Sequence, residues 1–126
     1  MAVDIKWHKK NVLITFSGQL ISDDIFYPNK VLISDPRFAN IRCILIDLSQ
    51  VTTTNLADDD ILVLKALDSS ATVWNSNIRM AIIAKNEVSN MLADKYMSLM
   101  KNSKIEIRKF SKDVDAKNYC SENHIL

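Results

Sequence analysis

Residues 41–48, IRCILIDL, are apolar at nearly every position and show no preference for one face of an extended chain. Such a stretch is typical of a central strand covered on both sides, because a strand that faces water alternates apolar and polar residues. Residues 78–84, IRMAIIA, have the same character. Helices must cover the sheet that contains such strands, so the chain is predicted to be an α/β protein.

The N-terminal segment predicts a β-hairpin over residues 3–17. Val3, Ile5 and Trp7 alternate with polar residues, which is the period-two pattern of a half-buried strand. The stretch NVLITFSG repeats this alternation after a short polar turn. We expect Gly18 to end the second strand.

A first helix is expected after the hairpin. Ser22 is a predicted helix cap, because the two aspartates that follow it suit the first turn, where free amide groups and the helix dipole favour acids. Pro28 lacks an amide hydrogen, so we expect it to kink or restart the helix near Tyr27. The helical segment should end around Ser34.

A second helix is predicted within LADDDILVLKALDSSATVW, which follows the threonines at 52–54. Asp58, Asp59 and Asp60 occupy its expected first turn, and apolar residues recur at helical spacing up to Trp74, which marks its end. These apolar residues cover more than half of the helix circumference. This breadth indicates burial on two sides, by the sheet and by a partner.

The remaining elements complete one domain of residues 1–126. Asn86 is predicted to cap a third helix, KIEIRKF alternates strictly as an edge strand would, and SKDVDAKNYC closes the chain with a short helix. The order is therefore ββαβαβαβα, without repeats or linkers. It predicts a mixed sheet with covering helices, in which right-handed helical crossovers join strands 3 to 5.

Charge and composition exclude several kinds of function. Sixteen basic and fifteen acidic residues give a net charge of +1 without a long basic run, so no nucleic-acid partner is expected. The single glycine excludes phosphate-cradling loops and dinucleotide fingerprints, and no cofactor is expected. MAVDIKWHKK lacks the pattern of a leader, and no segment reaches the roughly 18 apolar residues of a membrane span, so a cytosolic location is expected.

Histidines and cysteines give no catalytic or metal pattern. His8 and His124 are the only imidazoles, and no serine lies in a strained nucleophile turn, so no hydrolase arrangement can be assembled and the chain is not expected to be an enzyme. Cys43 and Cys120 have neither metal-ligand spacing nor a disulfide framework. We expect both to be reduced, core-filling residues.

Several stretches resemble those of STAS and SpoIIAA-like domains, which are relatives of anti-sigma-factor antagonists. NVLITFSG occurs early, ILIDLSQVTTTNLADDDI precedes the second helix, and MAIIAKN and IEIRKF follow. The most specific pattern is a strand that ends in D-L-S-x-V, here Asp47 to Val51, before a short loop and a helix start. The resemblance covers residues 3–120 and implies a SpoIIAA/STAS-like fold.

The resemblance also locates a phosphorylation site whose acceptor is missing here. In the phosphorylated antagonists this loop runs into D-S-S-G, and the second serine accepts phosphate from a partner kinase. Carrying this pattern across puts Asn55 at the aspartate, Leu56 and Ala57 at the two serines and Asp58 at the glycine. The chain is therefore most similar to the uncharacterised SpoIIAA-like branch that is sometimes grouped with lipid-binding Sec14-type domains.

The expected function is that of a regulatory or protein-interaction module, acting as a homodimer. Its predicted partner-binding residues are Thr52, Thr53, Thr54, Asn55, Leu56, Ala57, Asp58, Asp59, Val63 and Trp74. The threonines are expected to satisfy backbone amides or cap the helix, with phosphoacceptor or ligand contacts as the alternative, and the aspartates to complement the helix N-terminus, with a cation or basic partner as the alternative.

An alternative function is that of a carrier or sensor of a small apolar ligand, by analogy with Sec14-type domains. A chain of 126 residues leaves little volume for a lipid-sized cavity, which would need several hundred cubic ångströms. Exposure of Leu56, Val63 and Trp74 on one patch would favour a protein interface, whereas a closed, lined cavity would favour a ligand.

Overall fold

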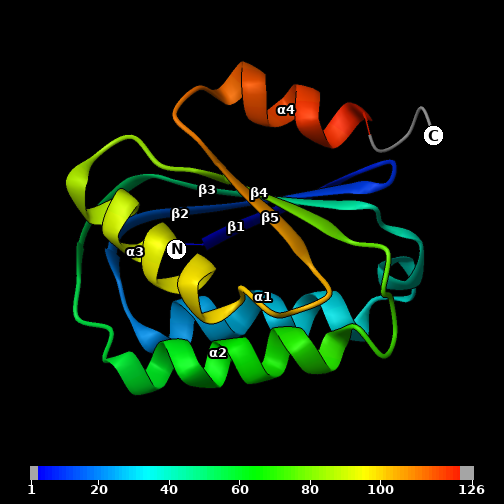
Figure 1. The fold of residues 1–126 in the computed structure, drawn as a ribbon, viewed down its shortest axis with the longest axis horizontal. Coiled ribbons are helices and arrows are strands. Elements are labelled where there is room, and N and C mark those ends of the chain that lie inside the picture. Colours follow the sequence, from blue (N-terminus) through cyan, green and yellow to red (C-terminus); the bar gives the residue numbers. More distant parts are fainter. Residues whose placement is uncertain (1–2, 123–126) are drawn as a thin grey trace.

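The computed structural model describes residues 3–122, which form five strands and four α-helices in the predicted order (Figure 1). A short 3-10 helix, η1, follows the first α-helix. The elements are β1 (Val3–His8), β2 (Asn11–Leu20), α1 (Ser22–Ser34), η1 (Pro36–Asn40), β3 (Cys43–Thr54), α2 (Asp58–Ala71), β4 (Arg79–Ile83), α3 (Glu87–Leu99), β5 (Glu106–Phe110) and α4 (Asp113–Glu122).

The strands form one mixed sheet in the order β1-β2-β3-β4-β5. β1 is antiparallel to β2, and every other neighbouring pair is parallel. The predicted mixed sheet is therefore confirmed, and β5 lies at an edge as its strict alternation indicated.

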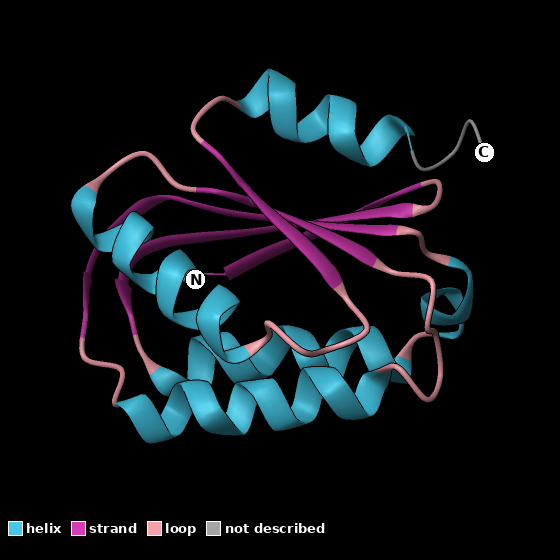
Figure 2. Cartoon of the chain, viewed as in Figure 1, coloured by secondary structure: helices cyan, strands magenta, loops and turns pink. Residues whose placement is uncertain are grey.

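Helices cover both faces of the sheet, but unequally. α1, α2 and α3 lie on one face and α4 alone lies on the other (Figure 2). Ile44 and Ile82 point into the main core beneath the three helices, whereas Leu45 and Ile83 point into a minor core beneath α4. This division explains why the two central strands are apolar on both faces.

The first helix differs from its prediction at two points. Ile21, not Ser22, precedes the first helical residue, and its backbone N–H donates to the Asp24 carboxylate at 3.2 Å. α1 also runs through Pro28 to Ser34, so the expected restart near Tyr27 is wrong. Pro28 is buried in the core, and this burial offsets the loss of its backbone hydrogen bond.

The second and third strands are longer than predicted. Gly18 does not end β2, which continues to Leu20 after register shifts on either side of Gly18. Gly18 has a φ of 71°, a left-handed conformation that a residue without a side chain adopts without strain. The irregularity keeps β2 paired with β3 as far as Thr54, so the expected loop at 52–54 is strand.

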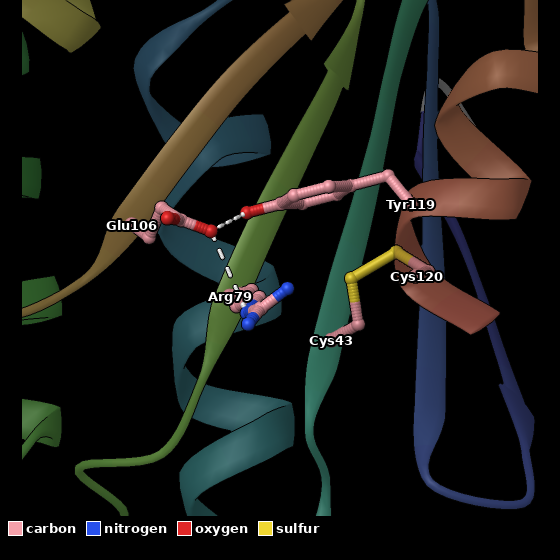
Figure 3. Close-up of a disulfide and its surroundings, with 5 residues drawn as sticks. All are labelled: Cys43, Arg79, Glu106, Tyr119 and Cys120. Carbon is pink, nitrogen blue, oxygen red and sulfur yellow. Dashed lines mark hydrogen bonds and ion pairs between the residues drawn. A yellow bond between two sulfur atoms is a disulfide. The ribbon is translucent and has the colours of Figure 1, made fainter. Parts of the chain in front are cut away.

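The two cysteines are joined, contrary to the expectation that both are reduced. Figure 3 shows Cys43 of β3 bonded to Cys120 of α4, with a Cα–Cα distance of 5.4 Å. Tyr119, next to Cys120, donates a hydrogen bond to the Glu106 carboxylate, which lies 3.5 Å from the Arg79 guanidinium. The sequence separation of 77 hid the pairing, because only the return of α4 onto the sheet brings the sulfur atoms together.

Candidate functional site

The junction between β3 and α2 is built differently from the expected capping loop. Thr52 and Thr53 are exposed at the end of β3, and Thr53 pairs with Gln19 of β2. The Thr54 hydroxyl donates to the Leu20 carbonyl and accepts from the Leu56 N–H, each at 3.1 Å. The threonines therefore extend the sheet and fix the turn; Thr54 satisfies a backbone amide as expected, and none of the three caps α2.

The start of α2 has an alanine at the position that precedes the helix, so no side-chain hydroxyl is present there. Ala57 is the residue that precedes the helix, and its N–H donates to the Asp60 carboxylate at 3.0 Å. Asp58 forms an exposed ion pair with Lys95 of α3 at 2.8 Å, and this hydrogen bond lowers the pKa of Asp58. Asn55 and Asp59 are exposed.

These aspartates do not converge on one point. Within residues 3–122, no three histidine, cysteine, aspartate or glutamate side chains gather in a way that could hold a metal ion. No helix of the described range has the length and apolar character needed to cross a membrane.

An apolar patch covers the outer face of α2 and the turn after it. The α2 patch consists of exposed apolar residues, of which Val63 and Leu67 share one side of the helix at a spacing of four residues: Leu62, Val63, Leu67, Val73 and Trp74. Val63, Val73 and Trp74 are 49%, 82% and 69% exposed. The N–H groups of Val73 and Trp74 donate to the Ser70 and Ala71 carbonyls, so these two residues form a tight turn directly after the helix.

Leu56 is not part of this surface. It packs against the main core and lines the cavity beneath α2, although it precedes the exposed start of the helix by only two residues. The three residues whose joint exposure would favour a protein interface are thus divided, with Val63 and Trp74 exposed and Leu56 lining the cavity.

The cavity beneath α2 lies between the sheet and the three helices of the main core. It has a volume of about 120 Å³ and a lining that is almost entirely aliphatic and aromatic. Ile82 contributes from β4, Leu32 from α1, Leu64 from α2 and Leu92 from α3. The cavity is small in comparison with sites for drug-sized ligands, which occupy roughly 300 Å³ or more.

Asp68 is the acidic residue of the cavity wall. Its carboxylate accepts hydrogen bonds from the Asn29 amide of α1 and from the Tyr96 hydroxyl of α3. Burial raises the pKa of Asp68 to about 6, against the two hydrogen bonds, which lower it. Burial and the neighbouring carboxylate in turn raise the pKa of Tyr96 well above its usual value.

Sequence reasoning did not identify Asp68, although a signal was present. Ile61, Leu64, Asp68 and Ala71 follow one another at spacings of three or four residues, which places them on a single face of α2. Ile61 and Ala71 are buried, so the aspartate between them occupies the core-facing side. A charged residue in an otherwise apolar stripe indicates a buried polar contact.

The predicted cap of α3 is confirmed and connects the helix to the junction. The Asn86 side chain accepts from the Ser89 N–H at 2.7 Å and donates to the Val51 carbonyl at 3.1 Å. Within the strand-end pattern, Asp47 accepts from both the backbone and the hydroxyl of Ser49. The D-L-S-x-V segment is therefore held by structural hydrogen bonds.

No model of a protein family matches this chain, and no curated protein matches it. Several solved structures are similar to this chain, and three of them match it along nearly the whole length. An uncharacterized protein of the DUF3478 family from Shewanella loihica PV-4, with a SpoIIAA-like fold, is 21% identical, with a TM-score of 0.59 and coverage of 94% of this chain and 92% of that one.

The other two are anti-sigma factor antagonists. One, from Mycobacterium paratuberculosis, is 13% identical with a TM-score of 0.63, covering 94% of this chain and 92% of that one. The second is SpoIIAA in its unphosphorylated form, 8% identical with a TM-score of 0.62, covering 95% and 98%. The arrangement of its sheet and helices and these likenesses show that the chain has the SpoIIAA-like, STAS-type fold.

Proposed function

We propose that this protein is a non-enzymatic regulatory module that binds a protein partner through the α2 patch and the adjoining junction. The exposed junction residues that would take part are Thr52, Thr53, Asn55, Ala57, Asp58 and Asp59. Thr54 and Leu56 hold this surface in place from within. Two of the similar structures are described as anti-sigma factor antagonists, a name that refers to action on another protein.

The observation that carries the proposal is the exposure of Trp74 beside Val73. A tryptophan and a valine that are 69% and 82% exposed leave apolar surface in water next to the exposed aliphatic residues of α2. Contiguous exposed apolar patches mark interaction sites, and tryptophan is among the residues that contribute most to interface affinity. An unidentified ligand in a closed cavity would not require this exposure.

The charges around the patch favour a different protein over a second copy of the chain. Asp58 and Asp59 lie at one end of the patch, and no basic residue occurs between Lys65 and Arg79 at the other end. Between Lys65 and Arg79, the segment itself would therefore offer no cation to Asp59 in an antiparallel α2 pair, and a parallel pair would bring acids together. We infer a partner whose apolar surface is flanked by basic residues.

Phosphorylation at the helix start would not regulate binding at this site. Ala57 has no hydroxyl to accept a phosphate, while the aspartates that follow it carry permanent negative charge. The partner would therefore meet an acidic helix start at all times.

The alternative, a carrier of a small apolar ligand, is limited by the volume of the cavity. About 120 Å³ excludes a lipid-sized molecule, so the alternative applies only to much smaller ligands.

The cytosolic location stays a prediction, and the Cys43–Cys120 bond is a feature more typical of oxidising compartments.

The test starts with affinity purification from the native cells and identification of the captured proteins. Binding of a purified candidate is then measured with Val63→Asp and Trp74→Ala, and with Val114→Asp as the matched control. Val114 is 58% exposed on α4, on the opposite face of the sheet. We expect the two patch variants to weaken binding by roughly tenfold or more and the control to change it by less than about twofold.

Two outcomes would contradict this assignment. Equal binding by Val63→Asp, Trp74→Ala and the unaltered protein would remove the α2 patch from the interface. Sedimentation that reveals a dimer of the unaltered chain, dissociated by Val63→Asp, would show that a second copy covers the patch. The expected homodimer is thus the competing arrangement in the same experiment.

A further inference from the structure

One carboxylate links the three helices of the main core at the wall of the cavity. Asp68 projects from α2, and its two oxygens accept hydrogen bonds from Asn29 of α1 and Tyr96 of α3. All three side chains line the cavity. A carboxylate has about four acceptor positions, so two hydrogen bonds leave further capacity on Asp68.

This carboxylate has no cationic partner within residues 3–122. Its hydrogen bonds come from an amide and a phenol, which are neutral, and none of the ion pairs of the described range includes Asp68. With a pKa of about 6, the group is mostly ionised at neutral pH. Placing a negative charge against apolar walls is unfavourable unless a cation balances it.

The size of the cavity restricts what could supply that cation. An apolar cavity of about 150 Å³ in another protein accommodates benzene. A volume of about 120 Å³ therefore fits a hydrocarbon body of roughly that size, and the lining is almost entirely apolar. Hydrated metal ions do not suit such a lining, because they keep oxygen ligands on several sides.

Entry is available where α1 faces α2. Asn29, Asp68 and Thr72 are partly exposed, and Ile33 is exposed, yet all four line the cavity. Asp68 thus lies in a partly exposed part of the lining, whereas Ile44 of β3 and Ile82 of β4 are buried and lie deeper. A ligand with one charged end and one apolar end matches this order.

We propose that the cavity binds a small apolar amine, whose protonated nitrogen pairs with the Asp68 carboxylate. Its hydrocarbon body would contact Leu64, Ile82 and Leu92, which line the deeper part. This site lies beneath α2, whereas the α2 patch lies on its outer side. The amine site and the protein-binding patch can therefore be tested independently of each other.

The first test compares two probes of matched shape on the unaltered full-length protein. Benzylamine and benzyl alcohol are titrated at pH 7.5 into ¹⁵N-labelled protein, and the shifts of backbone amide signals are followed. We expect benzylamine to shift signals of residues that line the cavity and to bind about tenfold more tightly than the alcohol. Equal affinities, or no shifts around the cavity with millimolar benzylamine, would overturn the proposal.

The second test removes the charge. Asp68→Asn should lose about tenfold in affinity for benzylamine and change affinity for benzyl alcohol by less than about threefold. Asp58→Asn, which neutralises an exposed acid on the same helix, should leave both affinities unchanged. Unaltered benzylamine binding by Asp68→Asn would overturn the assignment, and if this variant does not fold, the comparison of the two probes decides alone.

Discussion

Cys43 of β3 and Cys120 of α4 form a disulfide between positions separated by 77 residues. Both side chains are almost fully shielded and pack with Ala81 and Tyr119 in the minor core. Within the described residues, α4 contributes one large side chain to this core, Tyr119, beside the small Ala116 and Cys120. The bond therefore carries much of the attachment of α4.

Removal of the disulfide should destabilise the protein strongly. Closing a loop of this length restricts the unfolded chain by about 4 to 5 kcal/mol in the chain-entropy model, so the double variant Cys43→Ala, Cys120→Ala should lose a large part of that amount. Urea denaturation gives the free energy of unfolding, and hydrogen exchange should locate the greatest loss of protection in α4.

Reductant provides the control for this comparison. Dithiothreitol should destabilise the unaltered protein by a similar amount and leave the double variant unaffected. An unaltered protein whose unfolding does not respond to reductant would mean that the bond makes no contribution to stability.

Asp68 should make stability depend on pH between about 4 and 6. Its pKa rises from 3.8 in the unfolded chain to about 6 in the folded protein, so the folded state binds the proton more tightly. The corresponding stability is fully present below pH 3.8 and is lost as the pH rises through 6, by about 3 kcal/mol. The unfolding free energy of the unaltered protein, measured in urea at several pH values, should therefore increase relative to that of Asp68→Asn as the pH falls.

Asp58 supplies a control, because its contribution to stability changes with pH in the opposite direction to that of Asp68. Its hydrogen bond with Lys95 lowers the pKa of Asp58, so its contribution is present at neutral pH and is lost as the pH falls below 3.8. Asp58→Asn should thus lose stability relative to the unaltered protein at neutral pH, by a small amount because the pair is exposed. A difference between Asp68→Asn and the unaltered protein that is constant from pH 4 to 7 would refute the assignment of a raised pKa to Asp68.

Local patterns in the sequence were sufficient to predict the sheet and its helices. The apolar stretches at 41–48 and 78–84 became the central strands β3 and β4, and Asn86 caps α3 through Ser89 as predicted. These features depend on residues close in sequence or on burial of whole segments, which periodicity reports directly.

What the sequence did not reveal depends on contacts between distant segments. Thr53 is strand because Gln19 pairs with it after the irregularity at Gly18, and no local pattern contains that register. The disulfide likewise requires the position of α4, and the role of Asp68 requires Asn29 and Tyr96 from two other helices. Tertiary pairing decided these outcomes over local preference.

Asn75, a buried polar residue, should be essential for the chain reversal between α2 and β4. Its amide nitrogen donates to the carbonyls of Phe38 and Ile41, each at 2.8 Å, and its side-chain oxygen accepts from the Asn77 N–H at 3.0 Å. Asn75→Ala removes all three hydrogen bonds, leaves the Phe38 and Ile41 carbonyls only their longer bonds from the Ile41 N–H at 3.4 Å and the Arg42 guanidinium at 3.3 Å, and should cost about 2 to 4 kcal/mol of unfolding free energy.

The neighbouring Asn77 offers a matched control for this substitution. Its side chain is exposed, so Asn77→Ala should change stability by less than about 0.5 kcal/mol. Thermal unfolding of both variants is the measurement. Similar losses for Asn75→Ala and Asn77→Ala would mean that the hydrogen bonds of Asn75 are not the cause.

Restoring a hydroxyl at the start of α2 should stabilise the protein. Ala57 has the extended backbone of a capping residue, with φ of −82° and ψ of 160°, and Asp60 already accepts from its N–H. In Ala57→Ser the new hydroxyl can accept from the Asp60 N–H and complete a reciprocal pair, which should raise the free energy of unfolding in urea by about 1 kcal/mol.

Ala66→Ser, at an exposed position within α2, should instead lose a few tenths of a kcal/mol, because serine is a poorer helix former than alanine. A gain at Ala57 would show that the start of α2 lacks a stabilising side-chain cap, whereas no gain would mean that the helix start already satisfies its amide groups without one.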